Sequence, residues 1–309
     1  METLRDPDAR PTNGRPTVVT IGMFDGVHRG HAVLFEKVVA DARALDAAAA
    51  IVTFDPHPAE VVAPERAPCV LTTVDQRLAL FEERGIDITV VLQFDKELSN
   101  HTPAEFVKAA LVDVLHVKKV IVGEDFRFGH NRAGDVATLT ELGGELGFEA
   151  EAIGLVGGPD GKVGSSEIRR LIADGEVERA ADLLGHSYKL AGEVVHGDHR
   201  GRQLGFPTAN MSPHPRACLP RLGVYAGWWV WAGKRLPGVI NVGVRPTFKD
   251  SDPPLTEIHV LDFEGDLYGQ HGEVEFTAFL RPEEKFDGID ALVAQIRDDA
   301  DRAREVLTG

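Results

Sequence analysis

The amino-acid sequence predicts an α/β domain followed by an antiparallel β-barrel that ends in a helix. In the first half, short apolar segments alternate with segments of helical periodicity, a pattern typical of a parallel sheet covered by helices on both faces. In the second half, apolar residues alternate with polar ones and Gly and Pro are frequent, which is typical of a closed barrel of short strands. A chain of 309 residues also suits two domains of ordinary size.

The first half predicts strands and helices in regular alternation. Apolar runs mark the strands, and Pro56 and Pro58 prevent the second strand from continuing. Gly85 ends one helix, and Pro103 stands at a favoured first position of the next. The expected strands are 17–21, 49–54, 88–94, 119–123 and, as a candidate, 151–155, and the expected helices are 32–39, 74–84, 104–115 and 135–146.

The second half begins after a glycine-rich loop at 156–164, which leads into a helix at Ser165 and another at 177–184. We place the boundary between these helices and the barrel at 185–187, which gives domains at 16–185 and 187–309. A terminal helix over about 289–307 carries its apolar residues in one stripe. The expected barrel strands are 188–195, 223–231, 236–242, 256–263 and 273–280.

Composition excludes several classes of protein. The formal net charge of −16 argues against nucleic acid or an anionic membrane as the main partner. No apolar run reaches about 18 residues, so we expect no membrane-spanning helix, and 1–16 lacks the apolar core of a signal peptide. Cys69 and Cys218 are far apart and lack metal-ligand spacing, so we expect free thiols in a reducing cytoplasm. The oligomeric state stays open.

The segment Gly22–His31 lies where a buried strand turns into a helix. Such a turn offers unpaired backbone N–H groups and the positive end of a helix dipole to an anion. Gly26 and Gly30 let the backbone approach a ligand, and the imidazoles of His28 and His31 can donate hydrogen bonds to phosphate oxygens. The alternative is a strand–helix corner in which the two histidines are incidental. Glycine, aspartate and both histidines within one turn disfavour this alternative.

Distinctive residues follow two further strands, at Thr53–Pro58 and Gly123–Gly129. Ligands of open parallel sheets bind at the carboxyl ends of the strands, so these segments are expected to lie beside Gly22–His31. A fourth segment, Ser165–Arg169, opens a helix, where a serine can simply cap the first turn. The guanidinium of Arg169 can in addition hold a triphosphate, with the preceding loop as a lid.

Two segments of the second half carry chemistry. Gly201–Asn210 combines glycines and a proline with Thr208 and Asn210, whose oxygens suit Mg²⁺ bound mainly through water and phosphates, although a simple polar turn explains the pattern equally well. In the expected strand 256–263, Glu257 shares one face with His259 and Leu261. A carboxylate there can act as general base toward a hydroxyl, although an ordinary surface role is common for Glu.

These segments together resemble the bifunctional prokaryotic riboflavin kinase/FAD synthetase family from about Pro16 to the end of the chain. The strongest part is the pairing of Gly-x-Phe-Asp-Gly-Val-His-x-Gly-His with Gly-Arg-x-Leu-Gly-Phe-Pro-Thr-Ala-Asn, in this order. The family usually has a serine where Gly164 stands, which affects details of triphosphate binding. The matching segments are 22–31, 53–58, 122–129, 165–169, 201–210, 223–226, 241–248 and 266–269.

The resemblance implies a Rossmann-like FMN adenylyltransferase domain at 16–185 and a riboflavin kinase barrel at 187–309. The barrel would phosphorylate riboflavin with ATP to give FMN, and the first domain would adenylylate FMN to FAD and release pyrophosphate. Small molecules would be the partners, and ATP, riboflavin and FMN the substrates, with Mg²⁺. Two alternatives are a chain with one working site and a non-catalytic flavin-storage module, which the intact phosphate-handling motifs disfavour.

The resemblance also implies roles for individual residues. It implies that Glu257, His28 and His31 are catalytic. It also implies that Thr208 and Asn210 bind Mg²⁺. ATP binding falls to Gly22, Phe24, Asp25, Gly26, His28, Gly30, His31, Ser165, Arg169, Gly201, Gly205 and Pro207. Flavin binding falls to Phe54, Pro56, Pro58, Asp125 and Phe128 in the first domain and to Asn210 and Glu257 in the barrel, with core packing as the alternative for the aromatic residues.

Overall fold

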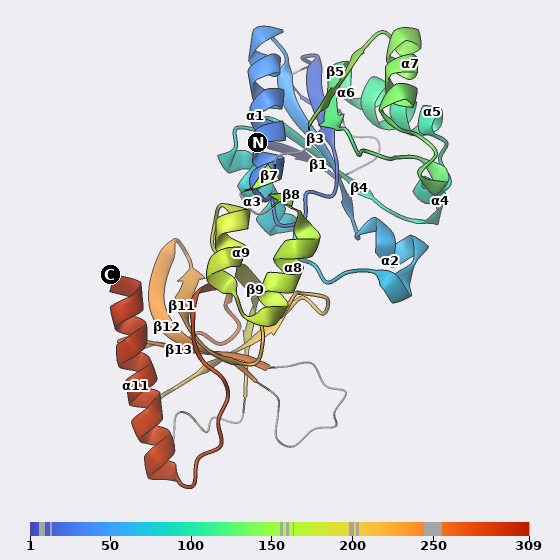
Figure 1. The fold of residues 1–309 in the computed structure, drawn as a ribbon. Helices are drawn as coiled ribbons and strands as arrows, with labels where there is room; N and C mark the ends of the chain where they lie inside the picture. Colours follow the sequence, from blue (N-terminus) through green and yellow to red (C-terminus); the bar gives the residue numbers. More distant parts are fainter. Residues whose placement is uncertain are drawn as a thin grey trace. The chain divides into compact units, whose positions relative to one another are not determined.

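A computed structural model describes residues 1–5, 10–12, 14–154, 157–158, 161–162, 164–197, 201, 204–243 and 255–308. Figure 1 shows the chain from its N-terminus in blue to its C-terminus in red. By contacts between Cα atoms, the chain divides into two compact units. The sheet unit comprises Met1–Pro68 and Val74–Gly164, and the barrel unit comprises Cys69–Thr73 and Ser165–Gly309. The predicted boundary at 185–187 therefore lies inside the barrel unit. Whether residues 187–309 fold on their own stays a prediction.

The sheet unit contains six parallel strands in the order β1-β4-β3-β2-β5-β6. The predicted α/β class is confirmed. The edge strand β1 was not predicted, because it has only three residues and packs mainly through Leu4. The strands are β1 (Glu2–Leu4), β2 (Thr17–Ile21), β3 (Ala48–Asp55), β4 (Ile88–Gln93), β5 (Val117–Gly123) and β6 (Glu149–Ile153).

Helices cover both faces of this sheet, as Figure 1 shows. Alternate residues of each strand point to opposite faces, so neighbours such as Val18 and Val19 belong to different apolar clusters. One face is covered by α1 (Arg29–Ala44) and α3 (Val74–Glu83), and the other by α5 (Pro103–Phe106), η2 (Val107–Val112), α6 (Asp113–Leu115) and α7 (Val136–Leu146). Short connecting elements are α2 (Pro58–Val62), η1 (Pro64–Arg66), α4 (Lys96–Ser99), η3 (His130–Arg132), β7 (Gly157–Gly158) and β8 (Gly161–Lys162).

The barrel unit is a closed antiparallel barrel in the order β10-β13-β12-β11-β14-β9, as predicted. The sequence predicts five of its strands, but not β10. That strand reads Ala-Asn-Met-Ser-Pro, which lacks β-branched and aromatic residues, so propensity gives no signal. The strands are β9 (Lys189–Val195), β10 (Ala209–Pro213), β11 (Gly223–Trp231), β12 (Lys234–Gly243), β13 (Leu255–Val260) and β14 (His271–Arg281).

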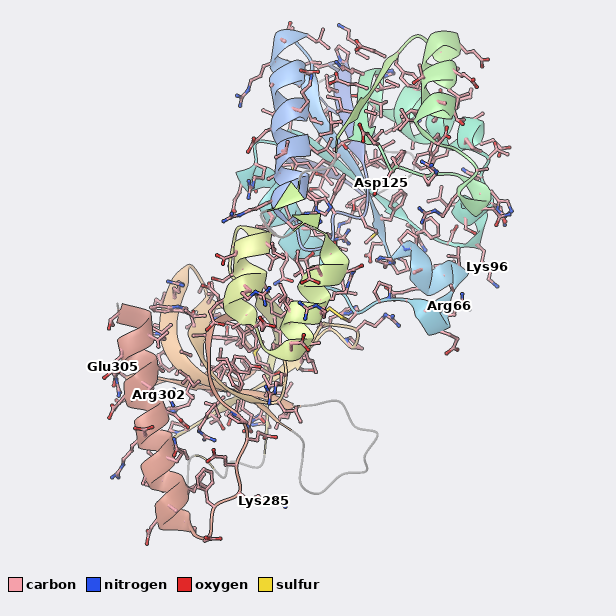
Figure 2. The ribbon with its side chains drawn as sticks, in the orientation of Figure 1. Arg66, Lys96, Asp125, Lys285, Arg302 and Glu305 are labelled. Carbon is pink, nitrogen blue, oxygen red and sulfur yellow. A yellow bond between two sulfur atoms is a disulfide. The ribbon has the colours of Figure 1, made fainter. Side chains whose placement is uncertain are left out.

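Among the described residues, three helices accompany the strands of the barrel unit. Helices α8 (Ser165–Asp174) and α9 (Val177–Leu184) share an apolar cluster with the inward-facing residues of the barrel. Helix α11 (Ile289–Thr308), on which Figure 2 labels Arg302 and Glu305, packs Ala300 and Ala303 on the outer face of the barrel. No helix among the described residues is both long and apolar enough to cross a membrane.

The expectation of free thiols at Cys69 and Cys218 is wrong for this structure. The segment Cys69–Thr73 lies in the barrel unit, where Val70 forms a parallel bridge with Ala217. This pairing brings the two cysteines to a Cα–Cα distance of 5.0 Å, and they form a disulfide across 149 residues of sequence. The sequence did not predict this disulfide, because only the five residues Cys69–Thr73 of this part of the chain belong to the barrel unit.

Candidate active sites at the sheet edge and on the barrel face

The sheet-edge site lies where the strand order changes direction. Strands β2, β3, β4 and β1 extend to one side, and β5 and β6 extend to the other, so β2 and β5 flank the switch point. Open parallel sheets bind ligands at this point, at the carboxyl ends of their strands. The three predicted segments follow β2, β3 and β5, which are neighbours, and the fold therefore brings them to one edge of the sheet.

The turn after β2 is held in an unusual backbone conformation. Phe24, Gly26 and Val27 all have positive φ, at 50°, 82° and 43°, which is uncommon outside glycine. Gly22 allows the turn to close, because a Cβ at this position would lie 2.8 Å from the Phe24 ring. Phe24, Val27 and Asp25 are buried, so the turn is packed into the unit rather than exposed.

The two histidines stand at the first turn of α1. His28 is the N-cap, and its Nδ1 accepts a hydrogen bond from the backbone N–H of His31 at 3.3 Å. Their rings stack at 3.6 Å between centroids, and Phe24 meets the His31 ring edge-on at 5.1 Å. Burial, reinforced by His28, holds the pKa of His31 well below its ordinary value of 6.5. His31 is therefore neutral near pH 7 and can serve as a hydrogen-bond donor, as a phosphate oxygen requires.

The predicted flavin contacts of the sheet unit differ in exposure. Phe128 is buried in the apolar core and Phe54 lies at its margin, against Phe94 and Phe106. Pro56, in a cis peptide bond after Asp55, is exposed, and so is Asp125, which follows β5 and is labelled in Figure 2. Pro58 is the first residue of α2 and half-buried. Core packing thus accounts for Phe128, and all five flavin roles stay predictions.

Ser165 and Arg169 belong to the barrel unit. Helix α8 begins at Ser165, so both Ser165 and Ser166 lie in its first turn. The Nε of Arg169 donates to the carbonyl of Cys69 at 2.7 Å, which fixes one side of its guanidinium within this unit. Their predicted part in ATP binding stays a prediction.

The barrel-face site is a row of polar side chains across three strands. Asn210 of β10 lies directly opposite Glu257 of β13, and Glu257 lies directly opposite Asn241 of β12. Residues opposite one another share a face of the sheet. Their neighbours Ala209, Ile258 and Ile240 point into the barrel core, so the row Asn210–Glu257–Asn241 lies on the outer face.

Asn241 was not among the predicted site residues. Its motif was recognised in the sequence, but its position beside Glu257 depends on the register between β12 and β13. Glu283 also approaches the row, because a Cβ on Gly243 would lie 2.3 Å from its Oε1 and 3.2 Å from the Nδ2 of Asn241. Burial raises the pKa of the Glu283 carboxyl.

Tight glycine contacts shape the segment before β10. A Cβ at Gly197 would lie 2.2 Å from the Asn210 amide, and a Cβ at Gly201 would lie 2.4 Å from the Phe206 carbonyl and 3.3 Å from the Thr208 hydroxyl. The carbonyl of Gly201 accepts hydrogen bonds from the N–H groups of Leu204 and Phe206, which closes the turn. Gly205 has a φ of 87°. Residues 202 and 203 of the motif Gly201–Asn210 lie outside the described residues, and so do residues 198–200 before it.

A cavity of about 460 Å³ opens at one end of the barrel. Pro207 and Thr208 line it, together with inward-facing Ala209 and Ile258 and the loop 263–268. Tyr268 of this loop stacks on His196 at 4.0 Å. Because Thr208 lines the cavity and lies two residues before Asn210, the cavity and the polar row are adjacent.

Comparison with known proteins identifies both units. The family model of FAD synthetase matches residues 10–167, and that of riboflavin kinase matches residues 184–307. The bifunctional riboflavin kinase/FMN adenylyltransferase of Escherichia coli K12 is 39% identical over 289 residues, which covers 93% of this chain and 92% of the relative. The protein of the same name from Bacillus subtilis 168 is 33% identical over 293 residues, which covers 93% and 91%.

The fold of the whole chain also has a solved counterpart. A crystal structure described as a macrolide-efflux protein from Streptococcus pneumoniae has a TM-score of 0.86 and 28% identity, and the match covers 98% of each chain. That description applies to the other protein. The similarity shows that both chains share the same fold. Both family models and the curated relatives confirm the resemblance seen in the sequence. The chain therefore belongs to the family of bifunctional riboflavin kinase/FMN adenylyltransferases.

Proposed function

We propose that this chain makes FAD from riboflavin in two steps, with one site in each unit. The barrel unit phosphorylates riboflavin with ATP to give FMN, and the sheet unit transfers AMP from a second ATP to FMN and releases pyrophosphate. The observation that carries this proposal is the match of the two family models to the two halves of the chain. The two candidate sites support it, because each lies in the half to which the corresponding activity belongs.

In the kinase step, we assign the role of general base to Glu257. Its position between Asn210 and Asn241 supports this role, because two amides can orient a carboxylate without neutralising its charge. The carboxylate accepts the proton of the riboflavin 5′-hydroxyl as the hydroxyl oxygen attacks the γ-phosphorus of ATP. ADP then leaves, and the cavity beside Thr208 is the place we propose for the nucleotide.

We place Mg²⁺ at Thr208 and Asn210 in this unit. Among the described residues, no group of three or more His, Cys, Asp or Glu side chains is placed to hold a metal ion. Mg²⁺ in phosphoryl-transfer sites needs only one or two protein oxygens besides water and phosphates, so a hydroxyl and an amide oxygen fit this ion. When bound, the ion neutralises charge on the transferred phosphoryl group.

In the adenylyl step, no general base is required, because the FMN phosphate is already ionised and attacks the α-phosphorus of ATP directly. His28 and His31 bind the phosphates and stabilise charge on the departing pyrophosphate. Their place at the N-terminus of α1 supports this role, since the helix dipole adds to their hydrogen bonds. We also propose that Arg169 and Ser165, which belong to the barrel unit, bind phosphate oxygens of ATP. Because both steps consume ATP, we assign the enzyme to the cytoplasm.

One assay tests the proposal directly. Purified protein is incubated with riboflavin, ATP and Mg²⁺, and the flavins are separated by chromatography over time. We expect FMN to appear first and FAD to follow. Accumulation of FMN alone would restrict the activity to the kinase, and conversion of added FMN without use of riboflavin would restrict it to the adenylyltransferase. Bound but unchanged riboflavin would indicate a storage protein and overturn the proposal.

A further inference from the structure

Arg77 is a buried cation beneath the sheet-edge site. Its helix α3 packs on the sheet, and the residue is only 2% exposed. Among the described residues of the sheet unit, the other buried lysine or arginine is Lys119, which is 8% exposed. Lys119 lies near the amino end of β5 in an ion-pair network with Asp41, Glu149 and Glu151, far along the strand from the site. The proposed mechanism uses neither cation.

The guanidinium of Arg77 joins two segments of the site. Its Nη1 donates to the Met23 carbonyl at 2.7 Å and to the Thr53 hydroxyl at 2.8 Å. Its Nη2 donates to the Phe54 carbonyl at 3.2 Å. Met23 belongs to the turn that carries the histidines, whereas Thr53 and Phe54 belong to the end of β3 and lead into the predicted flavin segment. The Thr53 hydroxyl in turn lies 3.3 Å from the Met23 carbonyl, to which it donates.

Charge also favours this arrangement. Burial lowers the pKa of the Arg77 guanidinium, and the carboxylates of Asp25, in the histidine turn, and Asp55, at the end of β3, oppose this effect electrostatically. Burying an arginine is costly unless acceptors and opposite charges compensate it. The same groups that compensate Arg77 belong to the two segments that it connects, so neither segment can move without disturbing the other.

We propose that Arg77 is a positioning residue for adenylyl transfer, which fixes the histidine turn after β2 relative to the flavin segment after β3. It thereby sets where bound ATP lies relative to bound FMN. The inference rests on the proposed assignment of adenylyl transfer to the sheet unit. A lysine cannot replace Arg77, because a single ammonium group lacks the planar fork that reaches the two carbonyls and the hydroxyl together.

The test compares Arg77→Lys with Lys119→Met, a control that removes the other buried cation of the same unit at a distance from the site. For FAD synthesis from added FMN, we expect Arg77→Lys to raise KM for both ATP and FMN several-fold. We expect its kcat/KM to fall about 10- to 100-fold, because small misplacements of reacting groups cost this much. Riboflavin phosphorylation by the same preparation should be unchanged. Lys119→Met should lower Tm but leave both KM values within about twofold of wild type, because lost folded protein changes kcat and not KM.

A double-mutant cycle keeps the proposal testable if one variant folds poorly. Thr53→Val removes one acceptor of Arg77 at nearly constant volume, and its effect on kcat/KM should be strongly non-additive with that of Arg77→Lys. The proposal would be overturned by any of three results. These are wild-type KM values in Arg77→Lys, KM changes in Lys119→Met as large as those in Arg77→Lys, or an additive double-mutant cycle. The proposed function fails differently, because the wild-type protein would then form no FAD from FMN.

Discussion

The histidine turn of the sheet-edge site is one continuous segment, whereas the polar row of the barrel-face site is built from residues on separate strands. In the first, Gly22–His31 supplies the backbone conformation, the helix cap and both histidines within ten residues. In the second, Asn210, Glu257 and Asn241 meet only through the register of β10, β13 and β12. Local sequence therefore specifies the histidine turn, and pairing between distant strands specifies the polar row.

The largest expected effect concerns the barrel face. We expect Glu257→Gln to lower riboflavin phosphorylation about 10²- to 10⁴-fold, because the amide keeps the size of the side chain but cannot accept a proton. FAD synthesis from added FMN should stay at the wild-type rate. Initial rates and riboflavin binding are measured in the same preparation, with Glu305→Gln on helix α11 as the control for loss of an acidic side chain. Normal kinase rates at every riboflavin concentration would remove Glu257 from the site.

The sheet edge should respond in the opposite way. We expect His28→Ala or His31→Ala to lower FAD synthesis from FMN about 10²- to 10³-fold, since each removes a donor to the charge that develops on the phosphates. Riboflavin phosphorylation should persist in both variants and serves as the internal control for correct folding of the barrel unit. If either variant kept near wild-type FAD synthesis, the role assigned to that histidine would be wrong.

A smaller effect tests the role of strand register. We expect Asn241→Ala to lower kinase activity roughly 10- to 100-fold, because the amide that we propose to orient the Glu257 carboxylate is removed. Ser212→Ala is the matched control, because Ser212 is exposed on β10 two residues beyond Asn210 and outside the row. Steady-state rates of both variants are compared at saturating ATP. Equal activities would show that register alone does not make Asn241 part of the site.

The smallest effect concerns pH and His31. In the folded chain the pKa of His31 lies below its ordinary value of 6.5, so the unfolded chain binds more protons as the pH falls through this value. Stability from this group is therefore complete above about pH 7 and is lost progressively toward about pH 5. We expect the Tm of His31→Gln to fall less than that of wild type over this range in thermal unfolding. Parallel Tm curves would contradict a lowered pKa of His31 in the folded chain.

The alternation of elements predicted the sheet, the barrel and the terminal helix, because each depends on local apolar periodicity. Periodicity could not predict β10, whose residues have weak strand propensity, or the disulfide, which depends on a five-residue excursion of Cys69–Thr73 into the barrel unit. The roles of Arg77 and Asn241 were not predicted either, because they depend on contacts between elements that are distant in the sequence. An arginine on an amphipathic helix is ordinarily a surface residue, and only the fold shows that Arg77 turns inward to three acceptors.

If two separable sites act in sequence, two variants that each lack one activity should complement one another when they are mixed. His31→Ala and Glu257→Gln are assayed with riboflavin, ATP and Mg²⁺, first separately and then together. We expect that His31→Ala stops at FMN and that Glu257→Gln forms FAD only from added FMN. The mixture should convert riboflavin to FAD, because FMN passes between molecules. A mixture that forms no FAD, or a single variant that loses both activities while folded, would show that the two sites are not separable.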